Sequence, residues 1–224
     1  MNKLSLLIFF VFFPLFALGD GWNESEYQAI EQAIEQPRIA DRSVVITKFG
    51  AKTTASAAQN QRAIQKAIAF LAHQGGGKVV VPAGKWHTGA LRLSSGIELV
   101  VSKDALLQFV FERSLYPLVK TSWEGMMCWN YSPCIYSFGS DDVVVSGEGT
   151  IDGGGSNETW WPMCGKEVFG YVKGVTKEAQ VLGSRRRLQQ MAEDDVPWDE
   201  RRFGLGYGLR PQLINFVKGN RVRV

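Results

Sequence analysis

Apolar residues recur with helical spacing in two early segments of the chain. Residues Trp22–Gln36 carry one such stripe, made of Tyr27, Ile30, Ala33 and Ile34, and Pro37 follows it. Residues Asn60–His73 carry a longer stripe, made of Ala63, Ile64, Ala67, Ile68 and Leu71. Because this spacing is typical of a helix with one buried face, we expect helices over both segments.

The rest of the chain is dominated by short apolar runs between glycine or polar turns. A β-branched run predicts a first strand over Ser43–Phe49, and Lys78–Val81 reads as a short buried strand. Seven more runs of three to five residues follow, at Gly89–Leu93, Ile97–Val101, Ala105–Phe109, Val143–Ser146, Thr150–Asp152, Leu213–Val217 and Arg221–Val224. This pattern predicts a fold built from many short strands.

Three of these runs resemble one recurring element, because those that begin after Gly96, Asp142 and Asn220 each follow a polar or glycine turn. A unit this short cannot bury its inward face alone, so its copies must stack. We therefore expect an all-β, right-handed parallel β-helix from about Lys78 onward, with Asn60–His73 as its N-terminal capping helix. The alternative, a β-sandwich, would show hairpin signals such as Asn-Gly between strands, and we identify none.

Two stretches do not fit such coils. Phe111–Ser137 is rich in aromatic residues, and an insertion of about 155–210 is long and interrupted, with a helix expected over Lys177–Ala192. Long insertions in stacked folds often build the walls of a cleft. A simple cap over the side of the stack is an equally open interpretation.

The N-terminus has the pattern of a secretory signal. Lys3 precedes the apolar run Leu4–Leu18, which is shorter than the about 20 residues of a membrane span. We expect cleavage near Gly19-Asp20 and export to the periplasm or the cell exterior, with an uncleaved membrane anchor as the alternative. The predicted organisation is a signal peptide over 1–19, a helical segment over 20–42 and β-helix coils over 43–224.

Composition narrows the function classes. The 224 residues include 24 glycines and seven tryptophans, and the net charge is only +3. No Lys/Arg run alternates with aromatic residues, so we expect no nucleic-acid partner. Three cysteines permit one disulfide, with Cys128 and Cys134 as a possible pair that sequence alone does not decide. Their spacing does not fit a zinc site, and we expect no metal or other cofactor.

Several segments, in order, resemble the polygalacturonases, the family-28 glycoside hydrolases that cut pectin. They are VVITKFGA from Val44, NQRAIQKAI from Asn60, GGGKVVVPAGKWHTGALRL from Gly75, SLYPLVKTSWEG from Ser114, VVVSGEGTIDGGG from Val143 and GLRPQLINF from Gly208. The resemblance covers Val44 to Val224. It implies a parallel β-helix that hydrolyses galacturonan, without a cofactor, and we expect a monomer that binds pectic polysaccharide or oligogalacturonides.

The family's catalytic motifs are N-x-D, D-D, G-H-G and R-x-K, and only D-D occurs here, at Asp141-Asp142 and Asp194-Asp195. Both pairs read as turns, and two neighbouring residues in an extended strand point to opposite faces. We assign no catalytic residue, expect the catalytic carboxylates downstream of residue 224, and expect these residues alone to be inactive. A non-catalytic polysaccharide-binding β-helix and a calcium-dependent pectate lyase are the alternatives.

Substrate contacts are the site residues that the chain itself offers. Tryptophan faces stack on sugar rings, and arginine pairs with uronate carboxylates. In or just after the matched segments, these chemistries indicate Trp123, Glu124, Trp160 and Arg210 as substrate-binding residues. For each of them, a packing role is the simpler alternative.

Overall fold

The computed structural model describes residues 23–176 and 183–224, so the predicted signal peptide and the start of the predicted helix over 177–192 lie outside it. The chain divides into two compact units, Met1–Glu35 and Gln36–Val224. In the first unit, helix α1 (Glu24–Ala33) confirms the expected helix. Asn23 caps it by accepting a hydrogen bond from the Ser25 N–H, and none of its residues is buried.

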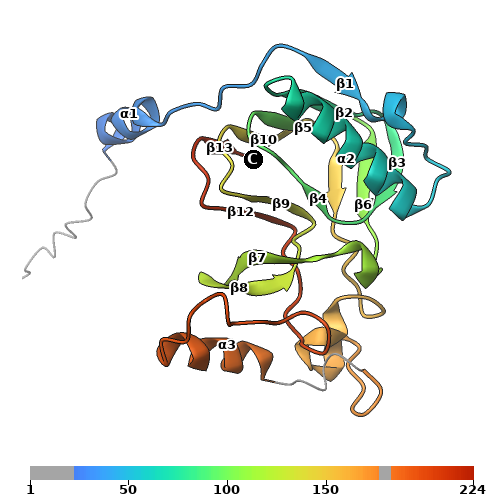
Figure 1. The fold of residues 1–224 in the computed structure, drawn as a ribbon, viewed down its shortest axis with the longest axis vertical. Helices are drawn as coiled ribbons and strands as arrows, with labels where there is room; N and C mark the ends of the chain where they lie inside the picture. The colour runs from blue at the N-terminus through green and yellow to red at the C-terminus, as the bar shows by residue number, and fades with distance from the viewer. Residues whose placement is uncertain (1–22, 177–182) are drawn as a thin grey trace, which may run out of the picture. The chain divides into compact units, whose positions relative to one another are not determined.

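The second unit is built from three sheets of parallel strands (Figure 1). Sheet A contains β1 (Ser43–Val45), β2 (Gly77–Val81), β5 (Ile97–Val101), β10 (Val143–Ser146) and β13 (Val222–Arg223). Sheet B contains β3 (Gly84–Thr88), β6 (Ala105–Phe109) and β11 (Thr150–Asp152), and sheet C contains β4 (Leu91–Arg92), β9 (Ile135–Phe138) and β12 (Ile214–Val217). From β2 onward the chain visits A, B and C in turn and then returns to A, so each circuit lays one strand beside its predecessor.

The register of the parallel strands places aliphatic side chains above one another inside this stack. Val79 in β2 pairs with Leu99 in β5, which pairs in turn with Val145 in β10, and all three are buried. In sheet C, Leu91 and Ile135 stack in the same way. Because each buried aliphatic side chain contributes about 1.5–3 kcal/mol, these interior columns stabilise the stack.

Helix α2 (Ala57–His73) covers the beginning of the stack (Figure 1). It starts three residues before the expected Asn60, because Ser56 and Gln59 form a reciprocal capping box. Its buried stripe is the one expected, with Ala57 and Asn60 in addition. Helix α2 contacts β2, β3 and β4, the first strands that the chain adds to sheets A, B and C after the helix.

Polar side chains on α2 also bond the backbone at the edge of the first coil. Asn60 Nδ2 donates to the His87 carbonyl at 3.1 Å, and Gln61 Nε2 donates to the Ala90 carbonyl at 2.7 Å. Gln65 makes two bonds with the backbone of Arg92, at 2.8 and 3.0 Å. Since an open strand edge leaves such groups unpaired, these amides take the place of a preceding strand.

Several strand boundaries differ from the expected ones. The Ser43–Phe49 strand ends at Val45, because Ile46–Phe49 form the 3₁₀ helix η1 and Gly50 follows in a left-handed conformation. Strands β3 and β9 were not expected. The sequence did not predict β9 because most of this strand lies inside the aromatic stretch Phe111–Ser137, which does not show the pattern of the other short strands.

The expectation of no hairpin was wrong. Strands β7 (Leu118–Trp123) and β8 (Met126–Tyr131) pair antiparallel. The turn between them, Glu124-Gly125, has positive φ at both residues (47° and 82°), as the favoured two-residue hairpin turns do. Glutamate is an uncommon residue in that conformation, so the turn lacks the Asn-Gly or Asp-Gly pair that marks a hairpin in a sequence.

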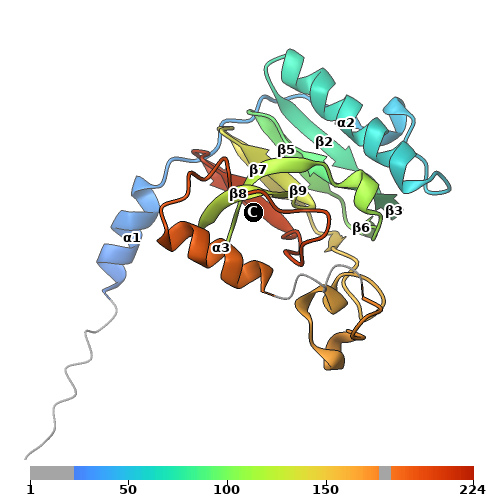
Figure 2. The same cartoon turned by 60° about the horizontal axis from the view of Figure 1, so that its bottom comes forward.

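The long insertion folds against this hairpin. It contains η3 (Trp161–Cys164), η4 (Glu167–Phe169) and α3 (Ser184–Glu193), and a further 3₁₀ turn, η2 (Arg113–Leu115), precedes β7. Figure 2 shows α3 beside β8. Leu188 of α3 packs in a second, small core with Cys128, Phe203 and Leu209.

All three cysteines are free, so Cys128 and Cys134 form no disulfide. Burial raises the pKa of Cys128 to about 11 and of Cys134 to about 12, so both are neutral packing residues. Among the described residues, no helix combines the length and the apolar character needed to cross a bilayer.

The buried face of α2 should be intolerant of charge. Ile68→Asp should lower the free energy of unfolding by about 3 kcal/mol or more, because it places a carboxylate under the capping helix. Urea unfolding followed by circular dichroism measures this. The control is Ala69→Asp, the same change at the next, exposed position. Equal stability of the two variants would contradict the capping role.

Candidate functional site

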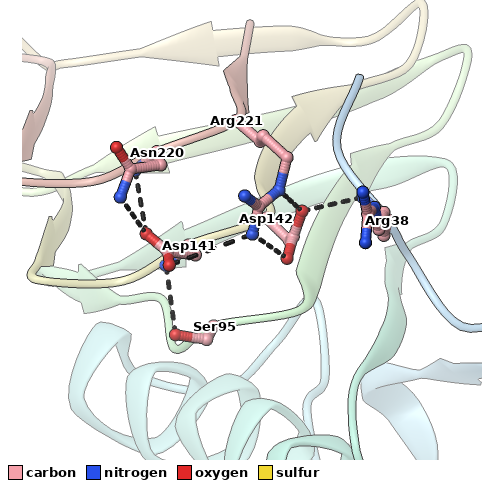
Figure 3. Close-up of polar contacts among 6 residues, drawn as sticks. All are labelled: Arg38, Ser95, Asp141, Asp142, Asn220 and Arg221. Carbon is pink, nitrogen blue, oxygen red and sulfur yellow. Dashed lines mark hydrogen bonds and ion pairs between the residues drawn. The ribbon is translucent and has the colours of Figure 1, made fainter. Parts of the chain in front are cut away.

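The Asp141-Asp142 pair is part of a polar cluster at the start of β10 (Figure 3). Arg221 approaches Asp142 with two nitrogens, Nε to Oδ1 at 2.6 Å and Nη2 to Oδ2 at 2.9 Å. The backbone N–H of Arg38 donates to the same Oδ1 at 2.9 Å. Asp142 has φ 57°, so the two aspartates are not in the extended backbone that would send their side chains to opposite faces.

Asp141 links three successive turns of the stack. Its backbone N–H donates to Ser95 Oγ at 3.1 Å, in the turn before β5. Its Oδ1 accepts from the backbone N–H and the side-chain amide of Asn220, both at 2.9 Å, in the turn before β13. The pair therefore holds neighbouring turns together, as the sequence-based interpretation of a turn suggested.

The other acidic pair ends α3. Asp194 accepts a hydrogen bond from Gln190 Nε2 at 3.0 Å, and Asp195 follows with φ 52°. This is the helix end and turn that we expected. Both Asp194 and Asp195 are exposed.

Two adjoining hollows lie where the hairpin meets the insertion. The first, which we call the hairpin pocket, has a volume of about 330 Å³ and is lined in part by Trp123, Glu124, Cys164, Lys166, Arg185 and Arg210. The second, which we call the indole pocket, has about 260 Å³ and is lined in part by Trp123, Trp160, Trp161, Arg210, Pro211 and Leu213. Trp123 and Arg210 line both, so the four residues indicated by sequence lie around one continuous region.

The two shared residues are joined by a hydrogen bond. Trp123 is partly exposed at the end of β7, and its Nε1 donates to the Arg210 carbonyl at 3.1 Å. The Arg210 guanidinium makes no hydrogen bond or ion pair with any described residue. Its charge is therefore available to a ligand.

The other two indicated residues have partners within the protein. Glu124 pairs with Arg185, Oε2 to Nε at 2.8 Å, and both side chains are exposed. Trp160 is only 5% exposed and packs edge-on against Phe111 and Tyr116. Its neighbour Trp161 is 43% exposed and offers the larger indole surface to the indole pocket.

Sequence reasoning did not assign Lys166 or Arg185 to this region. Arg185 lies in a run of three arginines in α3, and Lys166 lies in an irregular segment without a periodic pattern, so neither residue had a sequence signal for this region. Together with Arg210 they bring three cations to the hairpin pocket, against one carboxylate from Glu124. This balance favours an anionic ligand.

The hairpin and indole pockets lack the pair of carboxyl groups that acid–base cleavage of a glycosidic bond requires, as far as their described residues show. Inverting hydrolysis of a glycosidic bond needs two carboxyl groups about 6.5–9.5 Å apart, one as acid and one as base. Among the described residues that line the two pockets, Glu124 is the one carboxylate, and Arg185 holds it. No three His, Cys, Asp or Glu residues of the described part are grouped to hold a metal.

Comparison with known proteins finds similarity to polygalacturonases. No protein-family model matches the chain. A probable polygalacturonase of Vitis vinifera is 33% identical over 111 residues, which are 46% of this chain and 22% of that protein. The crystal structure of a hyperthermoactive exopolygalacturonase from Thermotoga maritima is 35% identical with a TM-score of 0.79, over 87% of this chain and 43% of that one.

The chain is related to the polygalacturonases. It spans less than half the length of both matched relatives, so the relationship concerns part of each of them. The parallel sheets with few helices agree with that relationship.

The Asp142 cluster should make stability depend on pH in acid. The pKa of Asp142 is lowered from 3.8 to about 2, chiefly by the hydrogen bonds from Arg221. Burial opposes this effect, and the Arg38 N–H adds a smaller lowering. The stabilisation is therefore complete above about pH 4 and is lost as the pH falls through 2. Asp142→Asn should cost on the order of 1 kcal/mol at neutral pH, because the pair is partly exposed.

Urea unfolding at several pH values from neutral to 2 tests this. Asp195→Asn is the matched control, because that aspartate also has positive φ but is exposed and makes no ion pair with a described residue. A wild-type protein and an Asp142→Asn variant with the same acid profile would show that the cluster adds nothing.

Proposed function

We propose that this chain is part of an exported glycoside hydrolase that cleaves galacturonan in pectin, and that its circuits of strands are coils of a right-handed parallel β-helix. The observation that carries the proposal is the 35% identity with a polygalacturonase structure over 87% of this chain. The succession of sheets A, B and C supports the β-helix, because each circuit adds one parallel strand to each sheet.

The role of the hairpin and indole pockets in this proposal is to bind uronate residues. The Arg210 guanidinium, which has no partner among the residues that the structure describes, can pair with a carboxylate through two parallel hydrogen bonds. The partly exposed faces of Trp123 and Trp161 are flat apolar surfaces of the kind that sugar rings cover. One region thus offers both parts of a galacturonate recognition site.

A second candidate function is polysaccharide binding without cleavage. It is favoured by the motifs of these 224 residues, which contain no N-x-D, G-H-G or R-x-K. In the two D-D pairs, Asp142 bonds Arg221 and Asp194 bonds Gln190 at the end of α3. The two candidates differ in the activity of the full-length protein: a hydrolase releases reducing ends from polygalacturonate, and a protein that only binds does not.

The pocket residues should control oligogalacturonide affinity. Trp123→Ala and Arg210→Gln should each weaken binding of a galacturonate trimer about tenfold, because each removes one of the two recognition elements. The arginine effect should shrink at high salt, since the contact is ionic. Isothermal titration measures both affinities.

Matched controls separate the pockets from the rest of the surface. Trp198→Ala removes an indole that lines neither pocket, and Arg223→Gln removes an exposed guanidinium elsewhere. Unchanged affinity in the two pocket variants, or an equal loss in the controls, would assign Trp123 and Arg210 a packing role.

A polypeptide of these 224 residues should bind pectic oligomers without hydrolysing them at a rate typical of an enzyme. Each missing acid or base removes a factor of about 10²–10⁴ in rate. A reducing-sugar assay on purified protein checks this. Hydrolysis that disappears in Asp141→Asn or Asp142→Asn would contradict both the expectation and the structural role of that pair.

A further inference from the structure

Charge is distributed unevenly along the chain. Residues 42–97 contain eight Lys and Arg and no Asp or Glu, so the other residues hold 17 Lys and Arg against 22 Asp and Glu. The small net charge of +3 therefore combines a strongly basic early segment with an acidic remainder. Such asymmetry is typical of a surface that meets a polyanion.

Part of this charge lines a hollow on the outer side of α2. The hollow, which we call the α2 groove, has a volume of about 440 Å³, and its cations are Lys52, Arg62 and Lys66. Phe49 and Ala63 are among its apolar residues, and Gln59 adds an amide. All three cationic side chains are exposed, and the lining contains no carboxylate.

These three cations have no partner within the described part of the protein. None of their side chains makes an ion pair or a hydrogen bond there. Other cations of the same basic segment differ, because Lys78 lies 3.9 Å from Glu98 and Arg42 donates to the Gln74 carbonyl. The unpaired cations of the segment thus include the three that share one concave surface.

The groove is formed by structured elements. Arg62 and Lys66 are four residues apart on α2 and so share one face, where like charges repel. Lys52 lies on the loop after η1, and Asn60 of α2 fixes that loop by accepting from the Lys52 backbone N–H at 3.0 Å. An anion between these side chains would relieve the repulsion without reordering the backbone.

We propose that the α2 groove is a second binding surface for carboxylates of a polyuronate chain, separate from the hairpin and indole pockets. Both views place α2 away from the β7–β8 hairpin (Figures 1 and 2). This inference rests on the proposed function for the identity of the polymer. A long pectic chain would then be bound both at the α2 groove and at the hairpin and indole pockets, so long chains should bind more tightly than short ones.

A carboxylate polymer fits the groove better than a nucleic acid does. Surfaces that hold single-stranded nucleic acids combine cations with aromatic faces on which bases stack. The groove has one aromatic residue, Phe49, which packs against Phe70 at a centroid distance of 5.4 Å. Exposed cations without stacking faces recognise charge along a chain.

The test is a triple variant, Lys52→Gln, Arg62→Gln and Lys66→Gln. It is titrated at low salt with de-esterified polygalacturonate, a galacturonate trimer, fully methyl-esterified pectin and an oligodeoxynucleotide. We expect its affinity for de-esterified polygalacturonate to fall about tenfold, the loss of several exposed ionic contacts. Binding of a galacturonate trimer to the pockets should stay unchanged. Fully methyl-esterified pectin, which lacks the charges, should bind the variant and the wild type equally.

The control triple variant is Lys103→Gln, Lys173→Gln and Arg223→Gln, which removes the same charge from exposed positions outside the groove. An equal loss in both triple variants would overturn the site in favour of net charge alone. Unchanged polymer affinity in the groove variant, with trimer binding still lost in Arg210→Gln, would overturn the groove and leave the proposed function intact. A loss confined to an oligodeoxynucleotide would assign the groove to phosphate polymers instead.

Discussion

The whole stack depends on how its first open edge is closed. A parallel strand without a preceding neighbour leaves backbone groups unpaired, and in this chain the amides of Asn60, Gln61 and Gln65 on α2 bond those groups. The same helix buries Ile64, Ile68 and Leu71 on the stripe that also carries Asn60. One helix therefore both pairs polar groups and covers apolar side chains at this edge, and the later strands of each sheet can repeat the same register.

A stack whose interior is filled by aliphatic columns has no room inside for a site. Hollows on the surface are then lined by segments outside the stacked strands, and the β7–β8 hairpin and the residues around η3 and α3 are such segments. They meet at Trp123 and Arg210, where one hydrogen bond joins the hairpin to the returning chain. The α2 groove is also on the outside, where the capping helix presents the polar side that does not face the coils.

The acidic pairs show why residue type alone does not identify a catalytic site. Asp141 and Asp142 have the composition of a family motif, yet their oxygens bond Asn220, Arg221 and the Arg38 backbone. Their function is to hold consecutive turns at the start of sheet A strands. A carboxylate occupied by an arginine on one side and a backbone N–H on the other is poorly placed to activate water.

The sequence by itself determined the local elements whose signal is periodic: the stripe of α2, four strands with the expected limits at Ile97–Val101, Ala105–Phe109, Val143–Ser146 and Thr150–Asp152, and the turn role of Asp142. Such signals are local because 3.6- and two-residue periods need no distant partner. Only the tertiary structure decided the Glu124-Gly125 hairpin, the meeting of Arg185 and Lys166 with Arg210, and the burial of Trp160. These depend on contacts between residues far apart in sequence, and an irregular insertion carries no periodicity from which its path can be derived.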